Sequence, residues 1–290
     1  MSKAERNAVI GSLVAAALGA IFAVAGSDGG NDVGSFPAFA LLVIVAFGLN
    51  VAAFIPSFLN TTERFYDLTG SLTYISVTVL ALIAADDLDL RSLLMGVLIL
   101  LWAGRLGTFL FRRIRKDGKD GRFDRIKTSF LRFLMAWMLQ GLWVTLTAGA
   151  AYAAITSGAK SSFGVLGVIG LVIWIVGFAI EVVSDRQKSA FRNDPANQGR
   201  FINVGLWTWS RHPNYFGEIT LWVGMAIIAI PALAGWQYLT LISPIFVATL
   251  LTRISGVPML ERRADKKWGG QTDYEQYKTD TPVLIPRPPR

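Results

Sequence analysis

Long apolar stretches constrain this sequence more than any other feature. Several of them exceed 18 residues, which is enough for an α-helix to cross the hydrocarbon core of a bilayer. Only 17% of the residues are charged, against about 25% in soluble proteins. These stretches predict an all-α, polytopic integral membrane bundle, with one membrane domain over residues 1–290 rather than two soluble domains.

The apolar stretches predict about eight transmembrane helices, with seven as the alternative count. The predicted spans are residues 8–25, 38–58, 67–85, 93–111, 129–155, 163–183, 216–234 and 236–251. The first stretch is not followed by a convincing signal-peptide cleavage site, so it is interpreted as a helix of the bundle. The residues after Arg253 are predicted to form a charged tail.

The basic residues are concentrated on one side of the membrane. The loops at 27–35 and 86–89 are acidic, whereas residues 112–127 form the most basic segment. With eight spans, only Arg91 and Lys160 lie on the side of the acidic loops. The positive-inside rule therefore places both termini in the cytoplasm, and the net charge of +8 is not taken as a sign of nucleic-acid binding.

The cysteine and histidine content excludes several kinds of active site. The chain has no cysteine and one histidine, His212. Disulfides, thiolate nucleophiles and iron–sulfur clusters are excluded, and a histidine-rich metal site cannot be built. A mechanism without a metal is expected.

A polar, basic segment at residues 181–218 lies between two long apolar stretches. Glu181, Asp185, Lys188 and Arg192 recur at spacings of four, three and four. They therefore share one stripe of a helix that continues from the preceding apolar stretch. This segment is predicted to contain the active site.

The second half of that segment predicts a helix start. It contains Arg211, His212, Pro213, Asn214, Tyr215 and Glu218. Proline disfavours the α conformation in the preceding residue and suits a first helical turn, so a helix is predicted to begin at Pro213 or Asn214. Asn214 and Glu218 then lie one turn apart on one face. His212 is either a general acid, since imidazole titrates near neutrality, or a structural cap or phosphate contact.

The first half of the chain contains a second set of polar residues within apolar spans. Asp67 shares a helical face with Ser71 and Tyr74, and Arg105 interrupts the fourth span. An arginine facing lipid would cost a few kcal/mol, so Arg105 is expected to point inward or to snorkel. Asp67 is either a functional carboxyl or a cap of the third helix.

Further short patterns accompany these residues: Gly205, Leu206, Trp207 and Thr208; Asp185 with Arg192; and Tyr274, Tyr277, Lys278, Ile285 and Pro286. Together with Arg105, Asn214 and Glu218, they resemble the C-terminal domain of the steroid 5α-reductase family, and more closely its bacterial membrane branch. The similarity covers roughly residues 67–289.

The resemblance implies an NADPH-dependent membrane reductase of a carbon–carbon double bond in a lipid or steroid-like enone, in a bacterial inner membrane. Residues 129–290 would bind the cofactor and residues 1–128 would form the substrate cavity. The resemblance, the polar stripe and the need for basic groups to bind phosphates together give the predicted cofactor-binding residues: Arg105, Glu181, Asp185, Arg192, Arg211, His212, Asn214, Tyr215, Glu218 and Tyr274.

The resemblance also identifies a departure in the expected catalytic residues. Steroid reductases hold the 3-keto oxygen with an early Glu and a later Tyr, which correspond by position to Asp67 and Trp102. The acid is kept in shortened form and the phenol is lost, so Tyr74 or Tyr66 must supply any phenolic donor. Asp67 and Tyr74 are the predicted catalytic residues.

Two other functions stay open. Isoprenylcysteine-type methyltransferases, which use S-adenosylmethionine, also carry an Arg-His-Pro-x-Tyr-x-Gly pattern like that beginning at Arg211. Asp185 with Arg192, and Asn214 with Glu218, favour a phosphate-bearing nucleotide over that cationic cofactor. A membrane scaffold would leave the clustering of polar residues unexplained. The expected partners are the bilayer and a hydrophobic small molecule, with no nucleic acid and no metal.

Overall fold

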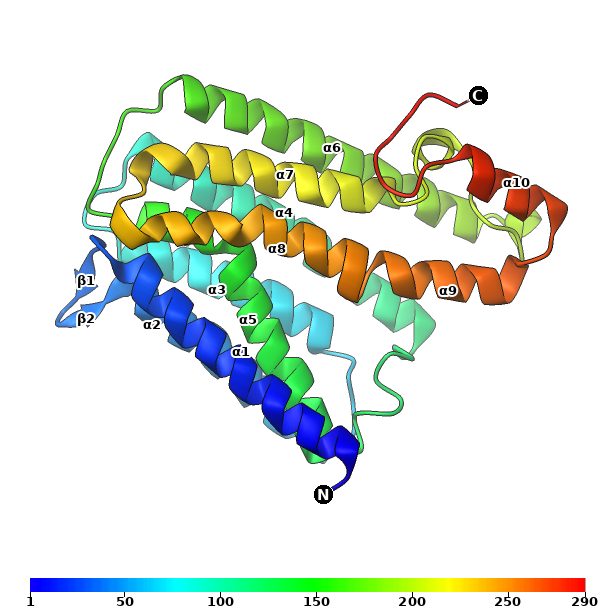
Figure 1. Ribbon diagram of the computed structural model, residues 1–290, viewed down its shortest axis with the longest axis horizontal. Coiled ribbons are helices and arrows are strands. Elements are labelled where there is room, and N and C mark those ends of the chain that lie inside the picture. Colours follow the sequence, from blue (N-terminus) through cyan, green and yellow to red (C-terminus); the bar gives the residue numbers. More distant parts are fainter. Residues whose placement is uncertain (290) are drawn as a thin grey trace. The chain divides into compact units, whose positions relative to one another are not determined.

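The computed structural model describes residues 1–289, without the side chain of Asp117. It confirms the predicted all-α class. The helices are α1 (Lys3–Ser27), α2 (Ala38–Leu59), α3 (Tyr66–Ile83), α4 (Leu90–Asp117), α5 (Phe130–Ile155), α6 (Val165–Asn193), α7 (Pro213–Ala229), α8 (Ser243–Thr249), α9 (Val257–Trp268) and α10 (Thr272–Asp280) (Figure 1).

The predicted number of membrane spans is confirmed. Residues 1–289 contain eight helical segments long and apolar enough to cross a membrane. Two helices are longer than their apolar stretches: α4 continues into the basic segment, and α6 continues through the polar stripe to Asn193. The protein is therefore a multi-pass membrane protein with polar helix extensions.

Two compact units make up the chain. The first contains residues 1–167 and 228–243, and the second contains residues 168–227 and those from Pro244 onward. Because α5 lies in the first unit, the units do not divide at residue 128. The assignment of substrate and cofactor to halves of the chain stays a prediction.

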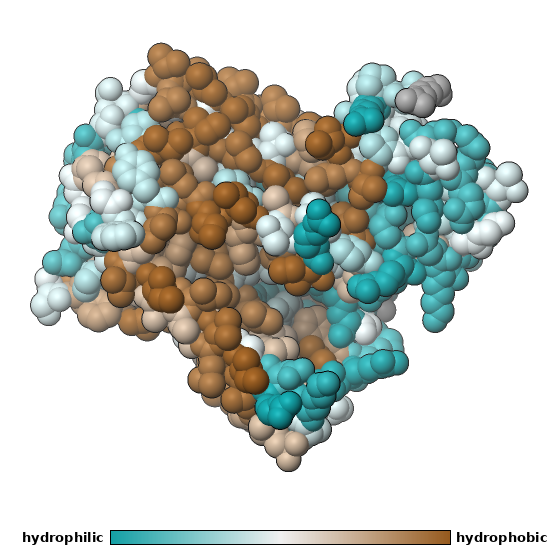
Figure 2. All heavy atoms as spheres, in the orientation of Figure 1, coloured by the Kyte–Doolittle hydropathy of each residue, from teal (hydrophilic) through white to brown (hydrophobic). Residues whose placement is uncertain are grey.

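In the first unit, α5 packs against α1 and α2, and α3 packs against α4. An aromatic cluster of Phe54, Phe133 and Trp137 is buried where α2 meets α5, with ring centroids 5.9 Å apart in each successive pair. Exposed apolar side chains such as Leu13 and Val24 line α1. Figure 2 shows hydrophobic atoms along the middle of α1 and hydrophilic atoms at its N-terminal end, as a lipid-facing helix requires.

One end of the first unit, the hairpin end (residues 26–37, 86–91, 156–162 and 234–237), is held mainly by backbone hydrogen bonds. It includes a small hairpin, β1 (Asp32–Val33) paired with β2 (Phe36–Pro37), which the sequence did not indicate. Asn31 N–H donates to the Thr156 carbonyl over 2.7 Å, and Trp236 N–H donates to the Asp28 carboxylate over 2.7 Å. Three segments distant in sequence are thereby joined.

The opposite end, the basic end (residues 60–66 and 112–129), begins with an unusual helix cap. After α2, the N–H groups of Thr61 and Thr62 donate to the carbonyls of Phe58 and Ser57 over 3.0 and 2.9 Å, forming a Schellman motif. Thr61 has a φ of 49°, a left-handed conformation that normally selects glycine at this position. A β-branched residue there stores strain of about 1–2 kcal/mol.

In the second unit, α6 and α7 approach so closely that only glycine fits between them. A Cβ on Gly177 would collide with the Leu221 backbone nitrogen, and one on Gly217 would lie 2.6 Å from that of Glu181. A Cβ on Gly224 would similarly meet the backbone of Trp174. The helices run antiparallel, so the C-terminal half of α6 lies beside the start of α7.

The last predicted span is confirmed as a helical segment able to cross a membrane, but it is not one continuous α-helix. The span expected at residues 236–251 consists of a 3₁₀ segment (Gly235–Ile242), α8 and a π-helical turn (Leu250–Ile254). The predicted charged tail contains two helices that were not predicted, α9 and α10. Its charged residues occupy helix faces that periodicity in hydrophobicity did not reveal.

Candidate functional site

Two buried acids of α6 lie beside the start of α7. Glu181 and Asp185 are 3% and 6% exposed. Asn214 Nδ2 donates to Asp185 Oδ1 over 3.4 Å. Helix α7 begins at Pro213, as predicted, and its positive N-terminal dipole stabilises nearby carboxylates. The glycine contacts between the helices therefore bring together two groups of predicted site residues.

The Gly-Leu-Trp-Thr segment forms a 3₁₀ turn (Gly205–Thr208) fixed to the same part of α6. Trp207 Nε1 donates to the Ser184 carbonyl over 3.1 Å, and Leu206 N–H donates to Gln187 Oε1 over 2.9 Å. Lys188 Nζ lies 4.5 Å from the centroid of the Trp207 ring. This segment is thus positioned next to Asp185 along the helix.

A second cluster joins the start of α7 to α9. Glu261 Oε2 is 3.2 Å from an Arg211 guanidinium nitrogen, and Glu261 Oε1 is 2.8 Å from His212 Nε2. The Tyr215 ring stacks on the His212 ring with centroids 5.6 Å apart and planes 10° apart. One acid of α9 therefore orients two adjacent basic residues of the predicted site.

The environment of His212 favours its neutral form. Burial lowers the pKa of His212, and the nearby charges of Lys188 and Arg211 act in the same direction, outweighing Glu261. In the neutral ring, Nε2–H donates to Glu261 and Nδ1 is an acceptor. Nδ1 is buried and has no hydrogen-bond partner within residues 1–289. Nδ1 is therefore a buried acceptor that the described chain leaves unsatisfied.

This environment predicts a pH-dependent contribution to stability. With its pKa lowered in the folded protein, His212 takes up a proton more readily in the unfolded chain once the pH falls below its ordinary value of 6.5. Above that pH the ring is neutral in both states. The melting temperature should therefore fall more steeply between about pH 7.5 and 5.5 in the wild type than in His212→Gln. Parallel melting curves for the two proteins would contradict this assignment.

The C-terminal segment packs against the same region of the second unit. Tyr277 Oη donates to the Trp207 carbonyl over 2.7 Å, and Arg211 N–H donates to the Pro282 carbonyl over 2.9 Å. Tyr274 Oη donates to Asp265 over 3.0 Å, and burial together with this bond raises the pKa of Tyr274. Tyr274 therefore supports the tail in this structure.

The remaining predicted cofactor residues are less constrained. Glu218 and Tyr215 are half-buried on α7, and Arg192 is exposed in the last turn of α6. Arg105, in the first unit, has its guanidinium carbon 5.4 Å from the centroid of the Phe109 ring. The role of each in cofactor binding stays a prediction.

In the first unit, Asp67 bridges two arginines. Its carboxylate oxygens are 3.3 Å from Arg113 and 3.3 Å from Arg122. Arg122 is also paired with Asp120 at 2.5 Å. The N-cap of α3 is Phe65, which makes no side-chain cap bond, so Asp67 belongs to the first turn. It links α3 to the end of α4 and to the basic loop.

The two candidate phenols differ in their surroundings. Tyr66 Oη donates to the Ala136 carbonyl over 2.9 Å and so fixes α3 to α5. Tyr74 is 6% exposed and packs edge-on against Trp102, with ring centroids 5.1 Å apart. Tyr74 therefore places a phenol beside the Trp102 indole.

Sequence reasoning missed Glu261, Arg122 and Asp120. Glu261 is one acid at the start of a basic stretch, and its partners lie 49 and 50 positions earlier in the chain, a separation that no local pattern encodes. Arg122 and Asp120 lay within a segment interpreted only through its net charge. The one available signal for Glu261 was its position as an acidic residue at the start of a basic stretch.

The residues around His212 fit a dinucleotide in their chemistry. Arg211 Nε and His212 Nδ1 are buried atoms without hydrogen-bond partners in the described chain, one a donor and one an acceptor. Glu181 and Asp185 add acceptors suited to ribose hydroxyls or to a carboxamide. No group of three or more His, Cys, Asp or Glu side chains within residues 1–289 is placed to hold a metal ion.

Comparisons with known proteins found one matching family and distant relatives. The model of a family described as "Protein of unknown function (DUF1295)" matches residues 53–281. An uncharacterised protein of Schizosaccharomyces pombe is 26% identical over 176 residues, which cover 50% of this chain and 51% of that protein. The 3-oxo-5-alpha-steroid 4-dehydrogenase 1 of Rattus norvegicus is 28% identical over 118 residues, or 40% of each chain. The chain thus spans about half or less of these relatives, and no solved structure matches it.

Proposed function

Because the chain belongs to the DUF1295 family, which is steroid 5α-reductase-like, we propose that it is a membrane reductase that uses NADPH to reduce a carbon–carbon double bond in a lipid or steroid-like enone. The observation that carries the proposal is the convergence of Asp185, Asn214, Arg211 and His212 around the start of α7. This convergence supplies donors and acceptors without a metal or a Rossmann fold.

In the proposed roles, Arg211 and Arg192 bind the phosphates, because guanidinium groups pair with phosphate oxygens in a bidentate manner. Asp185 and Glu218 accept hydrogen bonds from hydroxyl or amide groups, which suits ribose and nicotinamide. Neutral His212 accepts a further hydrogen bond at Nδ1. Bound NADPH would supply the hydride.

The first unit would bind the acceptor. Reduction of an enone adds a hydride to one alkene carbon and a proton to the other, and a hydrogen bond to the carbonyl lowers the barrier by stabilising the developing charge. We assign the hydrogen bond to Tyr74, on the basis of its position beside Trp102. Asp67 with its two arginines would orient the polar end of the substrate.

Thermal stabilisation of the purified, full-length protein tests this function and its rival. NADPH is expected to raise the melting temperature, whereas S-adenosylmethionine is expected to have no effect. Arg192→Ala should weaken NADPH binding by roughly ten- to hundredfold, the loss of a charge-assisted contact worth about 1.5–3 kcal/mol. Arg186→Ala is the matched control, since Arg186 is exposed on α6 but lies off the stripe.

Two results would contradict the proposal. Stabilisation by S-adenosylmethionine alone would favour the isoprenylcysteine-type methyltransferase. Equal losses in Arg192→Ala and Arg186→Ala would mean that the stripe of α6 does not bind the cofactor, and that only the general positive charge attracts the nucleotide.

We also propose that both termini are cytoplasmic, in a bacterial inner membrane. The basic end joins α2 to α3 and α4 to α5, and the acidic loops join the helices at the hairpin end. A tag placed after residue 290 should be protected from protease added to intact cells whose outer membrane is permeabilised. Cleavage of that tag in such cells would show that the C-terminus is periplasmic and would contradict the proposed orientation.

A further inference from the structure

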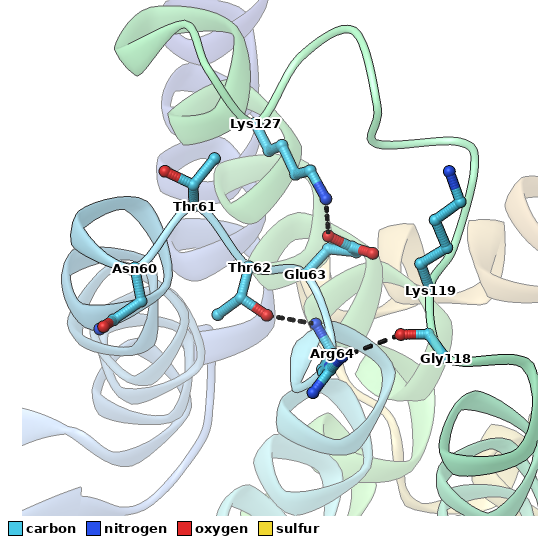
Figure 3. A pocket seen from close by; sticks show the side chains of 8 residues that line it. All are labelled: Asn60, Thr61, Thr62, Glu63, Arg64, Gly118, Lys119 and Lys127. Atoms are coloured by element: carbon cyan, nitrogen blue, oxygen red, sulfur yellow. Dashed lines mark hydrogen bonds and ion pairs between the residues drawn. The ribbon is translucent and has the colours of Figure 1, made fainter.

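A pocket of about 710 Å³ opens at the basic end of the first unit, apart from the residues assigned to catalysis (Figure 3). It is formed by the connection between α2 and α3 and by the loop that follows α4. The residues that line it are Asn60, Thr61, Thr62, Glu63, Arg64, Gly118, Lys119 and Lys127. Because both connections join consecutive spans, the pocket lies where the helices leave the hydrocarbon region.

The lining has an excess of positive charge. Lys127 Nζ is 2.7 Å from Glu63 Oε2, and the Asp120 N–H donates to the other Glu63 oxygen over 3.0 Å. Burial acts to raise the pKa of Glu63, but Lys127 and this N–H outweigh it and lower the pKa, so the pair is ionised and mutually neutral. Of the other charged lining residues, Arg64 and Lys119 are both basic, and the partner of Lys119, the exposed Asp124, lies outside the lining.

The C-terminus of α2, the negative end of its helix dipole, does not repel an anion in this pocket. The carbonyls at the end of α2 are occupied, since Asn60, Thr61 and Thr62 donate to Pro56, Phe58 and Ser57. Arg64 Nε donates to the Gly118 carbonyl over 3.2 Å, which fixes the guanidinium at the pocket and leaves its terminal nitrogens for another partner (Figure 3). The strained Thr61 backbone also lines this pocket, and strained residues cluster at binding sites.

Two neighbours in sequence of pocket residues carry exposed apolar side chains. Leu59, next to Asn60, is 76% exposed, and Phe65, next to Arg64, is 52% exposed. A free phosphate compound has no use for these side chains, whereas the acyl chains of a lipid would cover them. Basic pockets between transmembrane helices are suited to anionic headgroups.

We propose that this pocket binds the phosphate group of an anionic phospholipid, with Arg64 and Lys119 contacting the phosphate and Leu59 and Phe65 contacting the acyl chains. This proposal does not depend on the proposed reductase activity. It would anchor the connection between α2 and α3 to the membrane surface.

Native mass spectrometry of the full-length protein tests the site. Phosphatidylglycerol should bind with about tenfold lower affinity in Lys119→Gln, and lower still in Lys119→Gln combined with Arg64→Gln. Phosphatidylcholine, which has no net charge, should bind weakly to every variant. Lys119 has a side chain that is 66% exposed and pairs with the exposed Asp124, so its substitution should leave the fold intact.

Arg125→Gln is the matched control, because Arg125 is exposed at the same end but does not line the pocket. Equal losses in Lys119→Gln and Arg125→Gln would show only a general attraction of lipid to the basic surface and would overturn the proposal. Displacement of phosphatidylglycerol by equimolar inorganic phosphate would overturn the lipid assignment. If phosphatidylglycerol bound the double variant as tightly as the wild type, this pocket would not be the lipid site.

Discussion

Replacing Gly177 or Gly217 by alanine is expected to lower the free energy of unfolding by about 1–3 kcal/mol each, the usual effect of overpacking. The added methyl group would meet backbone atoms of the facing helix at less than 3.0 Å, and backbone cannot move aside as a flexible side chain does. The two helices would separate. Denaturation of the detergent-solubilised protein measures the loss.

The separation should also reach the candidate site, because Glu181 is one of the residues that the Gly217 methyl group would displace. NADPH stabilisation should therefore fall together with stability. Gly48→Ala is the matched control: Gly48 lies on α2, a methyl group added there would meet no atom within 4 Å, and alanine is favoured over glycine in helices. A Gly177→Ala protein as stable as Gly48→Ala would refute the close contact.

Replacing Tyr74 by phenylalanine is expected to lower turnover of an identified enone at least tenfold, equivalent to about 1.4 kcal/mol of lost transition-state stabilisation. The ring and its contact with Trp102 are kept, so NADPH affinity and the melting temperature should change little. Steady-state kinetics with the purified protein provides the measurement. Loss of substrate affinity at full turnover would mean that the phenol only binds substrate.

Tyr66→Phe is the informative comparison. It removes the hydrogen bond from Tyr66 to the Ala136 carbonyl, so a loss of about 1 kcal/mol in stability is expected. Turnover should be unchanged because this hydroxyl is engaged in joining α3 to α5. If Tyr66→Phe lost turnover and Tyr74→Phe did not, the two roles would be exchanged.

The membrane bundle was predictable because lipid imposes simple requirements on length and polarity. Eight segments satisfied them, and the stripe from Glu181 to Arg192 proved to be a continuation of α6. Where hydrophobic periodicity was absent, no helix was predicted. Helices α9 and α10 carry charge over most of their surface, and their apolar contacts, such as Phe201 against Tyr274, are few and distant in sequence.

The partners of the candidate site residues were less predictable than the residues themselves. Asp67 was identified from its place at the start of a span, but its pairing with Arg122 depends on how the basic loop folds back. Asp185 and Asn214 were identified separately, and their contact depends on glycines that allow α6 and α7 to approach. Such contacts depend on backbone distances that a single sequence does not specify.

The two ends of the first unit should respond differently to ionic strength. Most of the bonds at the hairpin end join neutral backbone groups, which dissolved ions hardly affect. At the basic end, Asp67 lies 3.3 Å from Arg113 and from Arg122, whose side chains are 39% and 36% exposed, so dissolved salt weakens these ion pairs more than it weakens backbone hydrogen bonds. We therefore expect the helices to loosen first where α3 meets α4. The local salt concentration and the surface charge of the membrane would then set how firmly α3 and α4 are held together at that end.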